Sequence, residues 1–400
     1  MRELASTARR GKRRIKKRPL YARKHLTFPI FIVVLALAVG PAASGWVTET
    51  GGMDNSSSTT DAPTTDPLAP QETFAPGQNP GPYLSFATWN ITKSVSSAVP
   101  SWAKRRLAIG RSLNESNSDV IAIQEATFHT VTGADGKRMT QRRDVIQMAS
   151  EGGYAAAAID ENKCKGACVH SAFLLYKTST IQQVDLPGDL PSAGQGKLDN
   201  VIKGLRYAKN REFGWAYFEG LNGAGKFLAV SVHLNNQNNT AGRRDRQRVG
   251  KAFTKWAEEL NEKSGLSGTP VILMGDFNSF KRREPEGMPI QLEKAGWKDS
   301  YKAASDEFKF FDSAYTVEYT GKSRNGWPKK PITSKNPVRI DYIMYRGEGL
   351  VADVYMVVVR TNPDGTFDNN YRGSDHLMVQ ALIHFNASTP AAEPSESPIP

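Results

Sequence analysis

Residues 270–278, PVILMGDFN, contain an apolar run that ends in an acid and an amide, Asp276 and Asn278. The run VILM has the continuous apolar character of a strand that is covered on both faces. Gly, Asp and Asn are residues typical of turns and of strand ends. The stretch therefore predicts a buried strand that brings a carboxylate and an amide to the edge of a sheet.

Other stretches along the chain show the same composition and alternate with helical patterns. The further predicted strands are residues 84–90, 119–125, 171–177, 212–219, 226–234, 338–346, 351–359 and 376–385. The predicted helices are residues 101–116, 141–152 and 243–262. This alternation predicts an α/β (α+β) layered domain.

The two ends of the chain differ in composition from the part between them. Residues 1–25 hold 11 basic residues and one acid, and residues 26–47 carry no charge. Twenty-two uncharged, largely apolar residues are long enough to span a bilayer, although the most apolar part is nearer the size of a signal peptide. A basic flank before such a run orients the N-terminus inward and the rest outward. We therefore expect a cytoplasmic arm followed by either a membrane anchor or a cleaved signal, with an exported remainder.

Two segments have the composition of disordered chain. Residues 48–80 are rich in Ser, Thr and Pro and contain five acids but no Lys or Arg, and residues 387–400 are similar. Such segments bury too little apolar surface to offset their conformational entropy. They are predicted to be a stalk and a tail around one domain at residues 81–386.

The charge and the cysteines restrict the kind of protein. The 400-residue chain has a formal net charge of +12 and two Cys, which excludes a disulfide scaffold and a Cys-rich zinc array. The predicted domain keeps 41 basic residues against 32 acidic ones. An excess of cations outside the N-terminal arm favours a polyanionic partner.

Polar residues gather at the predicted strand ends. They are Asn90, Glu125, His233, Asn235, Asp276, Asn278, Asp341, Asp375 and His376. Polar strand ends converge on one edge of a layered α/β domain, and clustered carboxylates need a cation to offset their repulsion. Oxygen ligands without Cys favour Mg²⁺, with Mn²⁺ and Ca²⁺ as alternatives, over zinc. The pattern suits metal-assisted cleavage of a phosphate ester.

Six short motifs carry a family resemblance. They are TWN (88–90), QE (124–125), VHLNN (232–236), GDFN (275–278), RIDYI (339–343) and SDH (374–376). In this order and spacing they resemble the endonuclease/exonuclease/phosphatase superfamily over about residues 83–385. The resemblance implies a four-layer sandwich of two packed mixed β-sheets flanked by helices, and a metal-dependent phosphoric ester hydrolase.

The resemblance also implies a role for each motif residue. Glu125 would bind the metal, with Asn90 and Asp375 nearby. Asp276 and Asn278 would orient the attacking water, and Asp341 would fix the tautomer of His376. His233 would act as a second acid or base. The predicted phosphate contacts are Asn235, Arg211 and Tyr176, the last because it closes a strand expected to reach the same edge.

Two further features bear on chemistry and partners. Cys164 and Cys168 lie in one short loop, and an exported domain favours a disulfide between them over two free thiols. Basic residues follow two of the motifs and recur before RIDYI, where aromatic residues are interleaved with them. They are Arg243, Arg244, Arg246, Arg248, Lys251, Lys281, Arg282, Arg283, Lys322, Arg324, Lys329 and Lys330. Cations among aromatics can hold phosphates and stack bases, although a solvated surface has the same composition.

Three functions stay open at this point. The first is an exported nuclease acting on DNA or RNA. The second is a lipid phosphodiesterase of the sphingomyelinase type or an inositol-phosphate phosphatase. The third is a surface protein that binds without catalysis, which the six intact motifs argue against. The membrane is an expected partner only through the N-terminal segment, and no protein partner can be inferred.

Overall fold

The structure is a computed structural model that describes residues 82–157, 172–303, 311–315, 327–333 and 337–385. The predicted arm, membrane or signal segment, stalk and tail lie outside these residues. Among the described residues, no helix combines the length and apolar character needed to cross a bilayer.

Two mixed β-sheets form the centre of the described fold. The first has six strands in the order β14–β15–β1–β2–β6–β5. Its strands are β1 (Tyr83–Asn90), β2 (Val120–Gln124), β5 (Tyr154–Ala156), β6 (Phe173–Lys177), β14 (Leu350–Val357) and β15 (Val379–Phe385). β1 pairs parallel with β2 and antiparallel with β15. The C-terminal ends of β1 and β2 therefore lie at the same edge.

The second sheet has the order β12–β13–β11–β10–β9–β7, with β8 also paired to β9. Its strands are β7 (Ile181–Gln183), β8 (Ala193–Lys197), β9 (Glu212–Gly220), β10 (Gly225–His233), β11 (Val271–Asp276), β12 (Lys298–Asp299) and β13 (Asp341–Arg346). β10 and β11 are parallel, whereas β13 runs antiparallel to β11. A separate hairpin is formed by β3 (Thr130–Thr132) and β4 (Arg138–Thr140).

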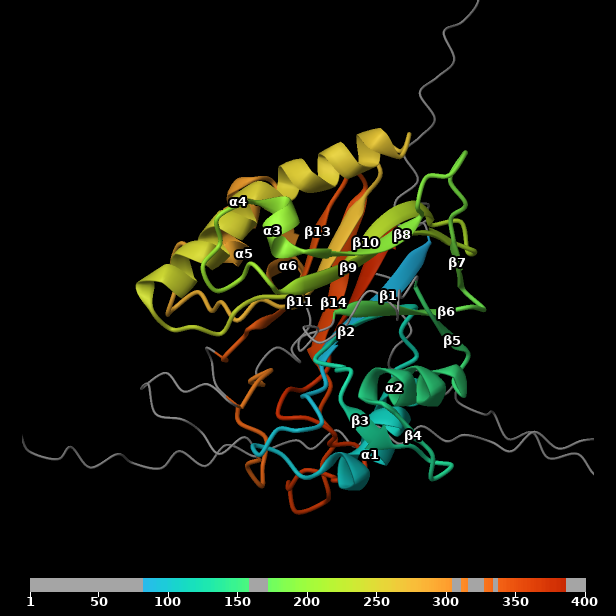
Figure 1. The fold of residues 1–400 in the computed structure, drawn as a ribbon, viewed down its shortest axis with the longest axis vertical. Helices are drawn as coiled ribbons and strands as arrows, with labels where there is room; N and C mark the ends of the chain where they lie inside the picture. Colours follow the sequence, from blue (N-terminus) through green and yellow to red (C-terminus); the bar gives the residue numbers. More distant parts are fainter. Residues whose placement is uncertain (1–81, 158–171, 304–310, 316–326, 334–336, 386–400) are drawn as a thin grey trace, which may run out of the picture. The chain divides into compact units, whose positions relative to one another are not determined.

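Helices cover the outer face of each sheet (Figure 1). Over the first sheet lie α1 (Trp102–Glu115) and α2 (Gln141–Ser150), and over the second lie α3 (Leu198–Val201), α4 (Thr240–Lys263) and α5 (Met288–Lys294). A short α6 (Ser300–Ala303) follows β12. The side chain of Asn239 accepts a hydrogen bond from Gly242 N and caps α4, which satisfies one of its free N-terminal donors. The result is the four-layer arrangement that the family resemblance implied.

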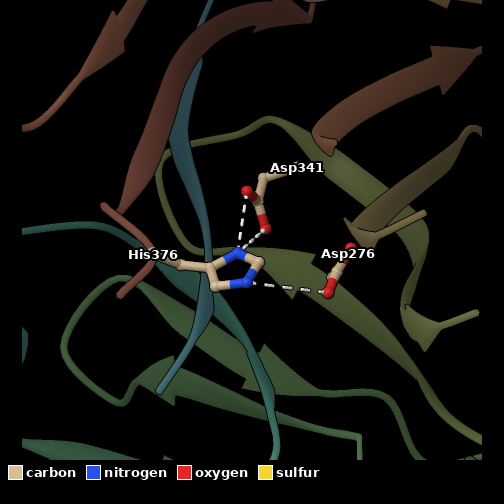
Figure 2. A group of neighbouring side chains, drawn as sticks. All are labelled: Asp276, Asp341 and His376. Atoms are coloured by element: carbon tan, nitrogen blue, oxygen red, sulfur yellow. Dashed lines mark hydrogen bonds and ion pairs between the residues drawn. The ribbon is translucent and has the colours of Figure 1, made fainter. Parts of the chain in front are cut away.

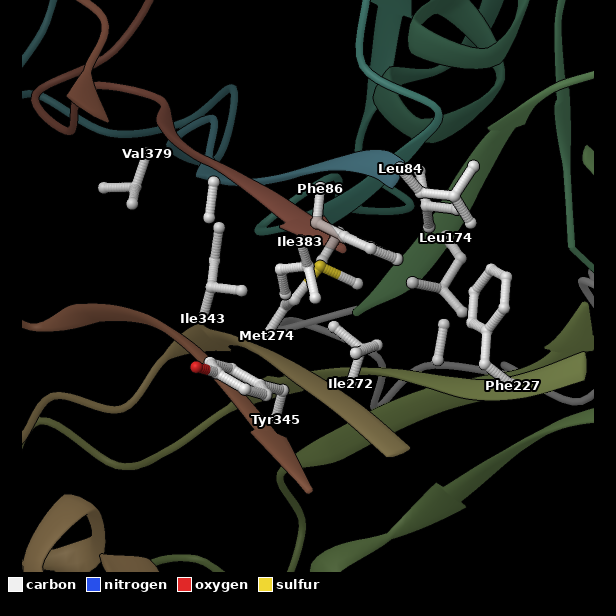
Figure 3. Close-up of a cluster of buried hydrophobic side chains, with 14 of the residues drawn as sticks. Leu84, Phe86, Leu174, Phe227, Ile272, Met274, Ile343, Tyr345, Val379 and Ile383 are labelled. Carbon is white, nitrogen blue, oxygen red and sulfur yellow. The ribbon is translucent and has the colours of Figure 1, made fainter. Parts of the chain in front are cut away.

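Apolar residues from both sheets meet in a central core (Figure 3). Alternate residues of each strand point inward, including Leu84 and Phe86 of β1, Phe227 of β10 and Ile272 of β11. Each of these side chains is 0 or 1% exposed. Burying one such side chain stabilises the fold by roughly 1.5–3 kcal/mol. This core packs the two sheets face to face and so fixes the position of one sheet's edge relative to the other's.

The nine predicted strands and three predicted helices are confirmed, with shifts of up to three residues at their ends. The strand predicted at 338–346 begins at Asp341, and that predicted at 376–385 begins at Val379. The short elements, such as β7, β12 and α6, carry too few residues for a periodic pattern and were not predicted.

Candidate active site

The predicted polar residues meet because of strand pairing. Across the second sheet, His233 of β10 pairs with Asp276 of β11, and Asp276 pairs with Asp341 of β13. In the first sheet, Asn90 at the end of β1 pairs with Gln124, which directly precedes Glu125. The two sheets pack so that these strand ends adjoin, and carboxylates, an amide and an imidazole therefore lie beside one another.

Backbone geometry explains why residue 275, directly before Asp276, is a glycine. Gly275 has φ +151°, and a Cβ there would lie 1.9 Å from the carbonyl oxygen of Val232. No side chain is tolerated where β10 and β11 approach this closely. The glycine of GDFN thus lets Asp276 align with His233.

Asp276 is held by a dense set of polar neighbours. Its Oδ2 accepts hydrogen bonds from Asn90 Nδ2 and Asn278 Nδ2, both at 3.0 Å, and its Oδ1 accepts one from Asn278 N at 2.8 Å. His233 Nε2 lies 3.4 Å from Oδ2. Burial opposes ionisation, but the hydrogen bonds and the neighbouring imidazoles outweigh it and lower the pKa of Asp276. Asp276 is therefore a fixed carboxylate at neutral pH.

His376 and Asp341 form a buried pair (Figure 2). His376 Nδ1 lies 3.1 and 3.0 Å from the two carboxylate oxygens of Asp341, and Ser313 Oγ donates to Asp341 Oδ2 at 2.8 Å. Burial alone would lower the pKa of His376, but the charge of Asp341 raises it well above the usual value. Since Nδ1 is engaged, Nε2 is the nitrogen that faces the site, 4.0 Å from Asp276 Oδ2.

Arg211 and His233 stand together at the second sheet's side of the site. Arg211 Nη1 lies 3.3–3.4 Å from the ring nitrogens of His233, and both side chains are buried. Burial lowers the pKa of Arg211, while Glu125 and Asp276 act in the opposite direction. The guanidinium is thus a cation held close to two carboxylates.

Three side-chain oxygens that could bind a metal accept hydrogen bonds from the turn after β1. Asn90 Oδ1 accepts from Thr92 N at 3.0 Å, Glu125 Oε2 accepts from Lys93 N at 2.9 Å, and Asp375 Oδ1 accepts from Thr92 Oγ1. Glu125 has φ +62°, a left-handed conformation that costs on the order of 1–2 kcal/mol for such a residue. Two carboxylates and an amide oxygen are ligands suited to a hard divalent cation. The structure thus brings the side chains of Asn90, Glu125 and Asp375 to one turn, and their role as metal ligands stays a prediction.

A second set of ligand atoms is possible in the same site. Atoms of Asp276, Asp341 and His376 lie within 4.8 Å of one another. In this set, the bond to Asp341 occupies His376 Nδ1. The set therefore offers two carboxylates and one imidazole nitrogen, a softer combination than the three oxygens around Thr92.

Asn235 is held in place by Arg246, a residue of the basic run that follows His233. Arg246 is fully buried, and its Nη1 donates to Asn235 O at 2.7 Å and to Asn235 Oδ1 at 3.0 Å. The same guanidinium forms an ion pair with the buried Glu284. Arg246 therefore orients the Asn235 segment and is no part of an exposed basic surface. Its position in line with the buried side of α4 was the available signal.

The structure does not bring Tyr176 to the site, so the premise of this prediction is wrong. Tyr176 on β6 pairs with Val120, the first residue of β2, whereas the site lies beyond the last residue, Gln124. Four residues of strand separate these ends by roughly 13 Å. Tyr176 instead packs against Phe218, with ring centroids 5.0 Å apart. Cys164 and Cys168, and Lys322 and Arg324, lie outside the described residues.

Several supporting residues were not predicted from the sequence. Gln141 Oε1 accepts from Ser94 N at 2.9 Å and from Thr127 Oγ1 at 2.8 Å, which joins the loops after β1 and β2. Thr92 and Ser374 share a 2.7 Å hydrogen bond between their hydroxyls. Ser374 belongs to the SDH motif and Thr92 lies two residues after Asn90, and these positions were the available signals. Gln141 opens α2, and nothing in the sequence marks it.

A four-layer sandwich with this set of carboxylates, amides and imidazoles at one edge defines a metal-dependent phosphoric ester hydrolase. The family model described as "Endonuclease/Exonuclease/phosphatase family" matches residues 87–376. The chain belongs to this family, whose members depend on divalent metals and include nucleases and phosphatases.

Several solved structures have a similar fold. A family protein from Bacteroides thetaiotaomicron has a TM-score of 0.54 and 18% identity, covering 77% of this chain and 99% of that one. One from Bacteroides vulgatus has a TM-score of 0.54 and 16% identity, covering 76% and 99%. A mannosyl-6-phosphatase of Bacteroides thetaiotaomicron has a TM-score of 0.52 and 17% identity, covering 76% and 100%. No curated protein matches the chain. At these identities the likeness shows the fold alone.

Proposed function

We propose that the protein is a Mg²⁺-dependent nuclease that hydrolyses DNA or RNA phosphodiesters. The observation that carries the choice of substrate is a set of exposed cations on three segments, each of which is linked to a residue of the active site. We call it the cationic ridge and define it by Arg206, Lys209, Arg243, Arg244, Lys281 and Arg282, all exposed.

Three segments form the cationic ridge, and hydrogen bonds tie two of them together. Asp245 Oδ2 of α4 accepts from Tyr207 N at 2.6 Å and from Ala208 N at 3.2 Å. Arg248 of α4 donates to Gly204 O and Lys203 O at 2.8 and 2.7 Å. These contacts hold the loop at residues 202–211 against the first turns of α4.

Each segment of the cationic ridge also reaches a site residue. The loop at 202–211 ends on Arg211, and Asn235 Nδ2 donates to Gly242 O at 3.4 Å in α4. Arg283, next to Lys281 and Arg282, donates to Asn278 O at 2.6 Å. Within residues 202–211, 240–251 and 279–283 the single acid is Asp245, which is buried. A polyanion bound at the site would therefore meet further cations along the ridge.

The site residues supply the steps of in-line hydrolysis. A divalent metal would be held by Asn90, Glu125 and Asp375, and it would polarise a phosphoryl oxygen and offset developing charge. Asp276 and Asn278 hold the attacking water, and His376 Nε2 takes its proton while the water oxygen bonds to phosphorus. His233 gives a proton to the leaving oxygen as its bond to phosphorus breaks. Arg211 and Asn235 bind the remaining phosphoryl oxygens.

A substrate panel tests this function. The purified protein is incubated with duplex DNA, single-stranded RNA, sphingomyelin vesicles and mannose 6-phosphate, with Mg²⁺ or with a chelator. We expect chelator-sensitive cleavage of a polynucleotide. Hydrolysis of the lipid or the sugar phosphate alone would assign the site to those substrates, and no product from any of the four would favour a protein that binds without catalysis.

Charge reversal on the cationic ridge gives the matched comparison. The double variant R243E/R244E should weaken polynucleotide binding. The slope of the logarithm of the binding constant against the logarithm of the salt concentration should also become shallower, by roughly one unit for each phosphate that the ridge no longer neutralises. The control K255E/K263E makes the same charge change further along α4 and should bind like the unaltered protein. Equal losses of polynucleotide binding in the two double variants would rule out a local role for the ridge.

The pH dependence follows from the Asp341–His376 pair. Asp341→Asn removes the charge that holds the proton on His376, so the pKa of His376 should fall. As a base His376 acts when neutral, so activity rises with pH through that pKa. The acid limb of kcat/KM should therefore move to lower pH with a lower plateau, because a weaker base is left. NMR titration of the His376 ring checks the shift directly, and an unchanged pKa would contradict the pairing.

We also propose that the enzyme acts at the extracellular face. The support is the basic arm followed by the uncharged residues 26–47. The enzyme is then either anchored by this segment or released after its cleavage. Mass spectrometry of the mature N-terminus separates the two, and a cytoplasmic location of the domain by protease accessibility would contradict both.

A further inference from the structure

We propose that Arg105 of α1 is a positioning residue of the metal site. It holds the loop that follows Asn90 and the loop that precedes Asp375, two of the three segments that carry the ligands, at one fixed separation. The inference rests on the proposed placement of the metal among Asn90, Glu125 and Asp375.

Arg105 donates to backbone carbonyls of two ligand-bearing loops. Its Nη1 donates to Ile91 O at 2.6 Å and to Gly373 O at 2.8 Å. Its Nη2 donates to Thr92 O at 2.5 Å and to Lys93 O at 3.0 Å. Residues 91–93 directly follow Asn90, and Gly373 lies two residues before Asp375. One guanidinium thus connects segments that are far apart in the chain.

Two of these four carbonyls belong to residues that contact the metal ligands themselves. Lys93, whose carbonyl oxygen meets Arg105, also donates through its N–H group to Glu125 Oε2 at 2.9 Å. Thr92 donates through N to Asn90 Oδ1 and through Oγ1 to Asp375 Oδ1. A displacement of the loop at residues 91–93 would therefore move the contacts of all three ligands.

The position requires a guanidinium. Arg105 is 2% exposed and stacks on Trp102 with its Cζ 5.0 Å from the ring centroid. Burial lowers the pKa of Arg105 to about 10, while Asp375 and Glu125 act in the opposite direction, so it stays charged at neutral pH. A planar fork directs separate donors to carbonyls on two sides, whereas the single nitrogen of a lysine cannot reach both loops in the same way.

The neighbouring arginine offers a matched control. Arg106 is also buried on α1, but it pairs with Asp144 of α2 through Nε at 2.9 Å and Nη2 at 2.6 Å. These bonds join two helices and involve neither ligand loop. R106K therefore disturbs a buried arginine of the same helix without touching the metal ligands.

The test measures metal affinity in the absence of substrate. Mn²⁺ is titrated calorimetrically into unaltered protein, R105K, R105Q, R106K and E125Q, each verified as folded by circular dichroism at the working temperature. We expect R105K to weaken Mn²⁺ binding by roughly 10–100-fold, the usual effect of removing a group that orients metal ligands. R105Q should weaken it further, because a neutral amide reaches fewer carbonyls, and R106K should leave the affinity unchanged.

The outcomes separate this inference from the assignments on which it rests. If E125Q abolishes binding while R105K and R105Q retain the unaltered affinity, Arg105 has no positioning role. Equal losses in R105K and R106K would show a general loss of stability and also overturn the proposal. If E125Q binds Mn²⁺ like the unaltered protein, the metal lies elsewhere and both assignments fail. None of these results depends on whether the substrate is a nucleic acid.

Discussion

His376→Ala is expected to reduce kcat by about 10²–10⁴-fold, the usual contribution of a general acid or base. The imidazole is oriented by Asp341 through Nδ1, which leaves Nε2 directed at the space beside Asp276. Alanine removes the proton acceptor and leaves Asp341 as a buried carboxylate with its bond from Ser313. Single-turnover cleavage of a labelled polynucleotide with saturating Mg²⁺ measures the chemical step.

The chain contains its own control for this substitution. His384, in the same C-terminal segment as His376, is buried and lies 2.8 Å from an Asp353 oxygen, so it also forms a His–Asp pair. However, it pairs with Tyr83 at the first residue of β1, the end of that strand away from the site. His384→Gln should reduce stability and leave kcat unchanged. If H376A retains nearly full kcat, or if H384Q loses as much, His376 is not the base.

Asp276→Asn is the second substitution with a large expected effect, a loss of about 10²–10³-fold in kcat. Three hydrogen-bond donors converge on its two oxygens, from the side chains of Asn90 and Asn278 and from Asn278 N. Whichever way an asparagine amide is turned, its NH₂ group meets at least one of these donors. The variant loses both the charge beside the attacking water and the fixed geometry, so KM should change less than kcat.

A buried aspartate outside the site controls for loss of stability. Asp144 accepts from Arg106 and from Trp102 Nε1 between α1 and α2. Asp144→Asn should lower the melting temperature by weakening a buried ion pair and keep kcat when assayed well below that temperature. Full activity of D276N would remove Asp276 from the mechanism.

Tyr176 shows one limit of local sequence patterns. The apolar run at residues 171–177 predicted a strand, and β6 forms at Phe173–Lys177. Alternation of side chains is the same for both directions of a strand, so the pattern did not say which end faces the site. Because β6 runs antiparallel to β2, its first residue lies at the end nearer the site and Tyr176 lies toward the far end.

Arg105 and Arg246 show a second limit. Arg246 was predicted only as part of a basic run and Arg105 was not singled out, since isolated charges usually favour water over the interior. Each is buried because loop carbonyls or a carboxylate satisfy its donors, as Ile91, Thr92 and Gly373 do for Arg105. Such partners lie far away in the sequence and no local pattern records them.

The sequence by itself determined the strands, the helices over them and the residues that end each strand. These follow from local periodicity and from short motifs such as GDFN, because side-chain burial on a strand or helix depends on spacing along the chain. Only the tertiary structure decided which strand ends lie next to one another. The pairing of β10, β11 and β13 made neighbours of His233, Asp276 and Asp341. In the other sheet, the pairing of β15 with β1 and β14 placed the His384–Asp353 pair at the end of β1 away from the site. Strand order and direction arise from packing between distant segments, so candidate residues could be named from the sequence, but which of them lie together could be learned only from the fold.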